Sequence, residues 1–393
     1  MLTDELMRSL SAHAHDLDEA SGGLMAGIER RLTRRRRRRV VGAAAGTLAV
    51  LATVAVGTET VISGDRAGTT GSTHTPDTSR SHFQIQPGGS VTLQGDPTVI
   101  TETPNGTIVY AVASTVYVVH GQSSTPLTTV SSDVFALAAD NQAAYVVTGR
   151  TVSAYSLTNG QQTGQWLLPR SPASPNGVPN GAGASAVDGA IFVWSAFETE
   201  QAGDPYFDVT RIVPGRQSVD VLSRRAYPNP AASATGFYFY TGRPGQAGNY
   251  LARAGASGAP IYTAVTHRGE LAAAGDRVIS YSEGDRAAPH VARWRLYDAS
   301  NLQPLGHVEL PSSFTSPIET ANGILAVMDV HFPGGDTGFP IVEVALLNSL
   351  EDPKPLATAT LPDEARDLVG PNPFIVSNGR VPPVLLNLRI TSE

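Results

Sequence analysis

Charged and aromatic side chains gather in four polar segments of the sequence, each between two short apolar runs. These segments span Glu198–Tyr206, Gly242–Asn249, Gly284–Pro289 and Pro333–Pro340. Their carboxylates, guanidinium groups and phenol could bind a ligand through ion pairs and hydrogen bonds, and the candidates are Glu198, Glu200, Asp204, Tyr206, Arg243, Asp285, Arg286 and Asp336. Long loops on a rigid scaffold are common binding places. Neutral insertion into exposed loops is the alternative explanation.

Linear motifs for catalysis or metal binding do not accompany these residues. The histidines of the long C-terminal part are scattered, without HxH or HExxH spacing, at His120, His267, His290, His307 and His331. The sequence has no GxSxG, Walker, GxGxxG or DxDxDG motif. It also has no cysteine, which excludes disulfides, thiolate metal sites and a Cys nucleophile. We therefore expect no catalytic residue, metal or cofactor, although a site assembled from several repeats would leave no linear motif.

The elements that must position the four segments are short β-strands. From Phe83 onwards, runs such as TIVYAVA, AAYVV, AIFVWSAF and GFYFY alternate with turns of Gly, Asn, Asp and Pro. Val, Ile, Tyr, Phe and Thr dominate these runs, and no long helical pattern interrupts them. The pattern predicts an all-β domain over residues 83–393. The aromatic run at 236–240 is predicted to be a strand buried on both faces.

A repeat sets the architecture of this domain. Tyr155–Pro169 (YSLTNGQQTGQWLLP) and Tyr297–Pro311 (YDASNLQPLGHVELP) share a strand, a polar turn, a second strand and a Leu-Pro end. Leu93, Leu168, Leu310 and Leu361 mark equivalent ends, spaced at about 45 residues per repeat, which is the length of a four-stranded propeller blade.

The spacing predicts a seven-bladed β-propeller. Its repeats are expected near 98–130, 134–169, 183–223, 232–265, 270–311, 317–362 and 366–392. The last repeat has room for three strands, and Phe83–Gly95 is predicted to supply its fourth strand and close the ring. Six or eight blades, or a pair of β-sandwiches, are the alternatives. In this architecture the four polar segments are long loops between the second and third strands of blades three to six.

Ala144–Trp166 (AYVVTGRTVSAYSLTNGQQTGQW) resembles one blade of the quinoprotein-like propeller repeats of the PQQ, YVTN and WD40 types. In those families a Thr-Gly turn and a docking Trp recur in successive blades. Here the chain has three tryptophans, Trp166, Trp194 and Trp294, and this departure argues against a quinone cofactor. The whole layout resembles actinobacterial single-pass membrane proteins with a basic N-terminus and an extracytoplasmic propeller, some of them similar to anti-sigma factors. The zinc-type His/Cys motif of many such regulators is missing.

The N-terminal part of the chain predicts a membrane anchor. Val40–Thr58 is a run of 19 uncharged residues, about 28 Å long as a helix, and Arg34, Arg35, Arg36, Arg37, Arg38 and Arg39 precede it. Such a basic block keeps its side of the helix in the cytoplasm, so we expect the propeller outside. A cleaved twin-Arg-type export signal and a soluble Ala-rich helix are the alternatives. Gly42 and Gly46 allow weak helix dimerisation.

Two further segments complete the predicted order. Residues 1–39 hold a short amphipathic helix in a basic cytoplasmic tail, and residues 59–82 form a flexible linker rich in Ser, Thr and Gly. Residues 40–393 hold 19 basic and 29 acidic side chains, which argues against nucleic acid as a partner.

The function predicted from these features is binding at the cell membrane. A membrane-anchored propeller would bind an unknown protein or small molecule outside the cell, as a sensor or scaffold, and signal to the cytoplasmic tail. The alternatives are an exported propeller enzyme of the hydrolase, lactonase or lyase kind and a passive envelope scaffold.

Overall fold

The computed structural model describes the propeller-forming part of the chain with several gaps. The described residues are 83–170, 181–196, 207–216, 218–227, 229–242, 248–282, 291–311, 315–320, 322–331, 341–350, 353–361, 365–369, 374–377 and 383–392. The predicted tail, its Arg34–Arg39 block, the membrane helix 40–58 and the linker 59–82 lie outside them. Within the described ranges, no helix has the length and apolar character needed to span a membrane.

Every regular element among the described residues is a β-strand, which confirms the all-β prediction. Four sheets each contain four consecutive antiparallel strands. The first two are β2 (Val99–Glu102), β3 (Ile108–Val112), β4 (Thr115–His120) and β5 (Ser123–Thr129), then β6 (Ala136–Ala139), β7 (Ala143–Thr148), β8 (Thr151–Ser156) and β9 (Gln162–Leu167). The other two are β18 (Glu270–Ala274), β19 (Arg277–Ser282), β20 (Val291–Asp298) and β21 (Pro304–Pro311), then β22 (Thr315–Thr320), β23 (Gly323–His331), β24 (Ile341–Leu347) and β25 (Pro355–Thr360).

The two ends of the domain share a fifth four-stranded sheet. It joins β26 (Ala365–Val369), β27 (Phe374–Ser377) and β28 (Val384–Ser392) to β1 (Phe83–Thr92), in the order β1-β28-β27-β26. The register runs from the pair Phe83–Ser392 to the pair Thr92–Val384. The predicted closing strand is thus confirmed, and Leu93 continues the pairing by donating its N–H to the Pro383 carbonyl at 2.7 Å.

The remaining strands form one eight-stranded sheet. Its first half is β10 (Gly181–Val187), β11 (Ala190–Ala196), β12 (Phe207–Ile212) and β13 (Val219–Ala226), and its second half is β14 (Ala231–Ser233), β15 (Gly236–Thr241), β16 (Asn249–Ala254) and β17 (Ile261–Val265). One residue pair, Ala226–Thr241, joins the halves. Arg211 also bridges them, donating to the carbonyls of Gly255 and Gly258 at 3.0 and 2.9 Å while pairing with Asp220 at 2.7 Å.

The prediction of seven separate blades therefore needs a correction. Hydrogen bonding gives six sheets, because the expected third and fourth repeats share the Ala226–Thr241 pair. The cause is local: the end of β13 pairs with the end of β15, so the ladder continues across the boundary between the repeats.

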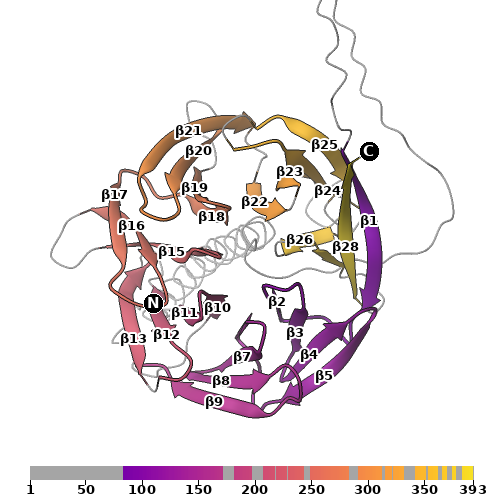
Figure 1. Ribbon diagram of the computed structural model, residues 1–393, viewed down its shortest axis with the longest axis vertical. Helices are drawn as coiled ribbons and strands as arrows, with labels where there is room; N and C mark the ends of the chain where they lie inside the picture. Colours follow the sequence, from indigo (N-terminus) through magenta and orange to yellow (C-terminus); the bar gives the residue numbers. More distant parts are fainter. Residues whose placement is uncertain are drawn as a thin grey trace, which may run out of the picture. The chain divides into compact units, whose positions relative to one another are not determined.

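The sheets stand around a central axis as a propeller (Figure 1). Innermost strands contact one another in sequence order from β2 to β6, β10, β14, β18 and β22, and β1 contacts both β25 and β5. Buried apolar clusters fill the spaces between consecutive sheets, such as Tyr145 and Val147 against Ile191 and Ile212. The alternative of two β-sandwiches is therefore wrong.

Position in a sheet determines how apolar a strand is. The second strands, such as β7 and β15, are buried almost throughout because neighbouring sheets cover both faces. The 236–240 prediction is thus confirmed, and Phe237 stacks on Phe192 with ring centroids 4.7 Å apart. Outermost strands such as β9 and β25 alternate between exposed and half-buried residues. The four predicted end-of-repeat leucines are all buried at or beside the end of an outermost strand: Leu93, Leu168, Leu310 and Leu361.

Candidate functional site

The four predicted binding segments lie between the expected strands. They separate β11 from β12, β15 from β16, β19 from β20 and β23 from β24, each time the second strand from the third. The candidate side chains themselves fall outside the described residues: Glu198, Glu200, Asp204, Tyr206, Arg243, Asp285, Arg286 and Asp336. Their role in binding stays a prediction.

The strand ends that flank these segments lie on one face of the ring. Because neighbouring strands are antiparallel, the turns between second and third strands lie on the same face as the links from one outermost strand to the next innermost strand. If the strands of each sheet are lettered A to D from the central axis outwards, this side carries the turns between strands B and C. We therefore call it the B–C face and the opposite side the A–B face. The described B–C turns are two-residue turns at Ala113–Ser114 and Gly149–Arg150, and Gly149 adopts a positive φ of 57° that such tight turns require.

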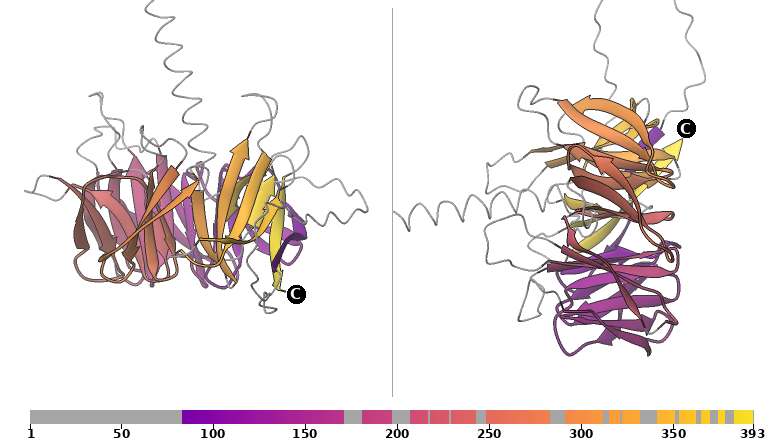
Figure 2. Two further views of the ribbon diagram at one scale, coloured as in Figure 1. Left: turned by 90° about the horizontal axis from the view of Figure 1, so that it is seen from above. Right: turned by 90° about the vertical axis from the view of Figure 1, so that its left-hand side faces the viewer.

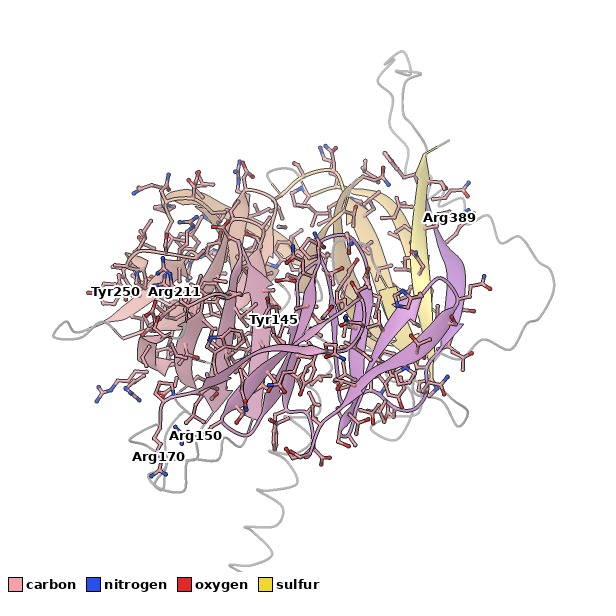
Figure 3. All side chains as sticks on the ribbon, turned by 60° about the horizontal axis from the view of Figure 1, so that its bottom comes forward. Tyr145, Arg150, Arg170, Arg211, Tyr250 and Arg389 are labelled. Atoms are coloured by element: carbon pink, nitrogen blue, oxygen red, sulfur yellow. The ribbon has the colours of Figure 1, made fainter. Side chains whose placement is uncertain are left out.

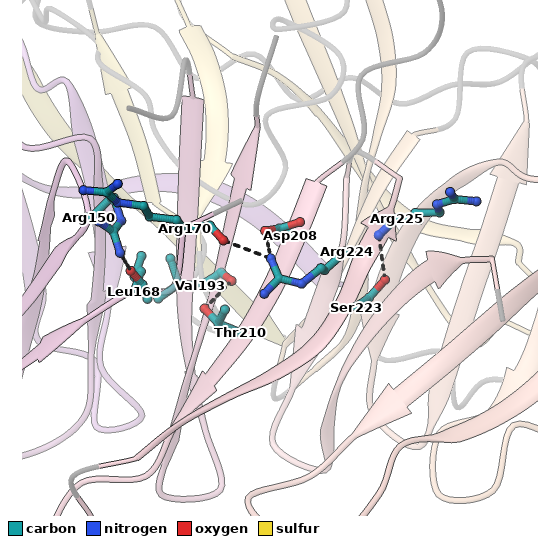
Figure 4. A network of polar contacts seen from close by, with 9 residues as sticks. All are labelled: Arg150, Leu168, Arg170, Val193, Asp208, Thr210, Ser223, Arg224 and Arg225. Carbon is teal, nitrogen blue, oxygen red and sulfur yellow. Dashed lines mark hydrogen bonds and ion pairs between the residues drawn. The ribbon is translucent and has the colours of Figure 1, made fainter. Parts of the chain in front are cut away.

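Arginine side chains gather where the β6–β9 sheet meets the β10–β13 half of the long sheet (Figures 3 and 4). Arg150, in the tight turn before β8, donates a short hydrogen bond from Nη2 to the carbonyl of Leu168. Arg170 follows two residues later, and Figures 3 and 4 show it beside Arg150. The Arg170 carbonyl accepts a 3.1 Å bond from Nη1 of Arg224, at the end of β13.

One carboxylate takes part in this network. Asp208, near the start of β12, accepts from Nη1 of Arg224 at 3.2 Å (Figure 4). The Asp208 side chain is 9% exposed and that of Arg224 is 42% exposed, so solvent screens the pair only in part. Among the described residues of this junction, three guanidinium groups lie near one carboxylate.

The positive charge continues along the same face. Arg225, exposed, follows Arg224 on β13, and its N–H donates to Ser223 Oγ at 3.1 Å. Arg268, in the link from β17 to β18, lies over the ring of Tyr227 with 3.7 Å between its Cζ atom and the ring centroid. We call the five residues Arg150, Arg170, Arg224, Arg225 and Arg268 the basic rim.

Beneath the rim, buried hydroxyls hold the strands in place. Tyr240 on β15 donates from its hydroxyl to Ser280 Oγ on β19 at 2.5 Å, and the N–H of Gly269 donates to that hydroxyl at 3.5 Å. Burial raises the pKa of Tyr240 to about 12. On the opposite A–B face, burial raises the pKa of Tyr145, and the hydrogen bond from its hydroxyl to Asp140 in the β6–β7 turn adds to this effect. Both phenols stay neutral at ordinary pH and act as structural donors.

Within the part of the chain that the structure describes, no group of three or more His, Cys, Asp and Glu side chains is placed to hold a metal ion. The basic rim offers planar guanidinium donors instead, and these bind carboxylates and other oxyanions by paired hydrogen bonds. The rim is therefore suited to anion binding.

Sequence reasoning missed the basic rim because its members come from four separate places in the chain. Two signals were available: the Arg224–Arg225 pair, and Arg170 directly after the Leu168–Pro169 end of a repeat. Neither indicates a site until the strands bring them to one face.

Comparison with known proteins gives structural neighbours. No protein-family model and no curated protein sequence matches the chain. A chain of the mitotic checkpoint complex is 10% identical, with a TM-score of 0.48, over 84% of this chain and 100% of that one. The Cps50 (Swd1) β-propeller domain of Myceliophteria thermophila is 9% identical, with a TM-score of 0.48, over 78% and 100%.

A third neighbour is the β-propeller domain of the Trilobed protease from Pyrococcus furiosus. It is 10% identical, with a TM-score of 0.41, over 65% of this chain and 85% of that one. At these levels of similarity the neighbours carry no argument about function, which has to come from this chain's own residues.

Proposed function

We propose that this chain is a single-pass membrane protein whose seven-bladed propeller lies outside the cytoplasm and binds a ligand or protein on its B–C face. Counting the halves of the long sheet as separate blades gives seven, since the β-ladder between the halves consists of a single residue pair. The charge pattern of Arg34–Arg39 followed by the uncharged run 40–58 supports the anchor and its orientation.

The observation that carries the choice of face is the pairing of β1 with β28. Phe83, where the chain enters the domain, pairs with Ser392, where it leaves. As the outermost strand of its sheet, β1 runs from the A–B face to the B–C face, so both ends lie on the A–B face. Figure 2 shows the C-terminus on one side of the disc. A flexible linker of residues 59–82 would thus join the domain at the A–B face, so its attachment point would leave the B–C face accessible to a partner.

Charge supports the same face. The basic rim lies on it, and the four long segments between second and third strands begin and end there. The proposal assigns the domain a binding role, as a sensor or scaffold, with signalling to the cytoplasmic tail as its further consequence.

Cysteine labelling tests the topology. Because the chain has no cysteine, single-cysteine variants give one reactive site each. Ser132→Cys in the β5–β6 link and Ser257→Cys in the β16–β17 turn replace exposed residues on opposite faces, and Ser9→Cys lies in the tail. A membrane-impermeant maleimide on intact cells should label the first two variants and should reach Ser9→Cys only after lysis.

Other outcomes would contradict this topology. Labelling of Ser9→Cys in intact cells would refute the orientation. A mature chain that lacks its first ~57 residues would show that the helix is an export signal, and transmembrane signalling would then be excluded. A photo-cross-linker on the two domain cysteines compares the faces: adducts from Ser132→Cys but not from Ser257→Cys are expected, and the reverse pattern would refute the choice of face.

A further inference from the structure

We propose that the basic rim binds an extended acidic segment of a partner protein, whose carboxylates pair with successive guanidinium groups. This inference rests on the proposed function, because it uses the same B–C face. It adds the chemistry of the partner and the residues that recognise it.

The first observation is the contrast between the rim and the rest of the domain. Residues 40–393 carry 29 acidic and 19 basic side chains. Even so, five arginines lie in sequence along one face, from the turn before β8 to the link before β18. Among the described residues, Asp208 forms an ion pair with one rim arginine, Arg224. An anionic ligand would complement the positive charge of the exposed guanidinium groups.

The second observation concerns the unused donors of the rim. Arg150 donates one hydrogen bond from Nη2 to the Leu168 carbonyl, and its Nε is buried without a hydrogen-bond partner. Across the described residues, the guanidinium groups of Arg170 and Arg225 make no hydrogen bond or ion pair. A guanidinium group offers five N–H donors, so the rim retains ample capacity for carboxylate oxygens.

The third observation favours separate carboxylates over a phosphate group. Arg224 and Arg225 are consecutive residues of β13, so their side chains leave opposite sides of the strand, as Figure 4 shows. The rim therefore presents cations one after another around the ring and does not close around one point. Asp208, mostly buried beside Arg224, would also repel a dianionic phosphate more strongly than a single carboxylate. An extended chain with repeated Asp or Glu side chains fits this spacing.

The test measures peptide binding by the full chain in nanodiscs of neutral lipid at low ionic strength. The probe is a fluorescent peptide of alternating Asp and Ser, and the control peptide has Asn at every Asp position. The variants are Arg170→Gln and Arg225→Gln, because both side chains are exposed and neither makes a hydrogen bond or ion pair with a described residue. Arg216→Gln is the matched control: Arg216 is exposed in the β12–β13 turn, on the A–B face.

The acidic peptide should bind and the Asn peptide should not. Each rim variant should weaken binding about two- to fivefold and the double variant about tenfold, since exposed ion pairs contribute modestly and separately. The Arg216→Gln protein should bind like the unmodified chain, and added salt should weaken binding.

Three results would overturn the inference. The first is equal weakening by Arg216→Gln and the rim variants, and the second is no peptide binding at all. The third concerns competition for the bound fluorescent peptide. If inorganic phosphate or phosphatidylserine vesicles displace it at a lower concentration of negative charge than unlabelled acidic peptide does, the rim would be assigned to phosphate groups. The peptide-binding test and the cysteine-labelling test are independent. Failure of peptide binding would not change the result for topology, and failure of the topology would not change the result for peptide binding.

Discussion

Tyr240 allows a test of how burial controls stability, because the size of its contribution to the free energy of unfolding should depend on pH. Its side chain is 1% exposed, and its hydroxyl joins β15 to Ser280 on β19 and to the N–H of Gly269. Replacing Tyr240 by Phe removes both hydrogen bonds, so Ser280 Oγ loses a donor and the N–H of Gly269 loses an acceptor. At pH 7 we expect the variant to lose about 1–2 kcal/mol of unfolding free energy.

Alkaline pH should remove this difference in stability. The folded pKa of Tyr240 is raised from 10.0 to about 12, chiefly by burial. Its stabilisation is therefore complete below pH 10 and is lost as pH rises toward 12, because the unfolded state releases its proton first. From this group the unmodified protein should lose about 1 kcal/mol by pH 11 and about 2 kcal/mol by pH 12. Phe has no proton to release, so the two proteins should approach equal stability near pH 11.

The assay is urea unfolding of residues 83–393 at pH 7, 10 and 11, followed by tryptophan fluorescence. We expect this fragment to be a soluble monomer, and its aggregation would count against an independently folded ring. Tyr110, Tyr145 and Tyr297 also have raised pKa values, but they are present in both proteins and cancel in the comparison. A stability gap of the same size at pH 7 and pH 11 would refute the reasoning.

Three further substitutions test the ring itself. Leu93→Ala should cost about 2–5 kcal/mol in urea unfolding because Leu93 is buried beside the closing strand, whereas Leu305→Ala at a half-exposed site should cost much less; equal losses would argue against closure by β1. Gly183→Ala should lower the thermal midpoint, at a cost of about 1–3 kcal/mol, since its Cβ would lie 2.1 Å from the Trp194 ring. Gly255→Ala has its nearest neighbour at 3.9 Å and is the control. Arg211→Met should cost about 1–3 kcal/mol by removing the bridge to Gly255 and Gly258, and an unchanged urea midpoint would show that the bridge is dispensable.

The sequence by itself determined the strands and their grouping. Hydrophobic runs bounded by turn residues are local signals, so the repeats near 134–169 and 270–311 coincide with β6–β9 and β18–β21. The recurring leucines at 93, 168, 310 and 361 marked the ends of outermost strands, because each repeat must bury an apolar side chain there. The closing role predicted for Phe83–Gly95 followed from a last repeat with only three strands, since an unpaired edge is unfavourable, and β1 (Phe83–Thr92) confirms it.

Only the tertiary structure decided what the strands bring together. The Ala226–Thr241 pair merges two repeats. No local pattern specifies this contact between the end of an outermost strand, β13, and the end of the second strand of the next repeat, β15. The basic rim depends on residues from position 150 to 268 reaching one face, which pairing and ring closure determine. Charge has no periodicity tied to a strand, so its grouping emerges only when distant turns meet in space.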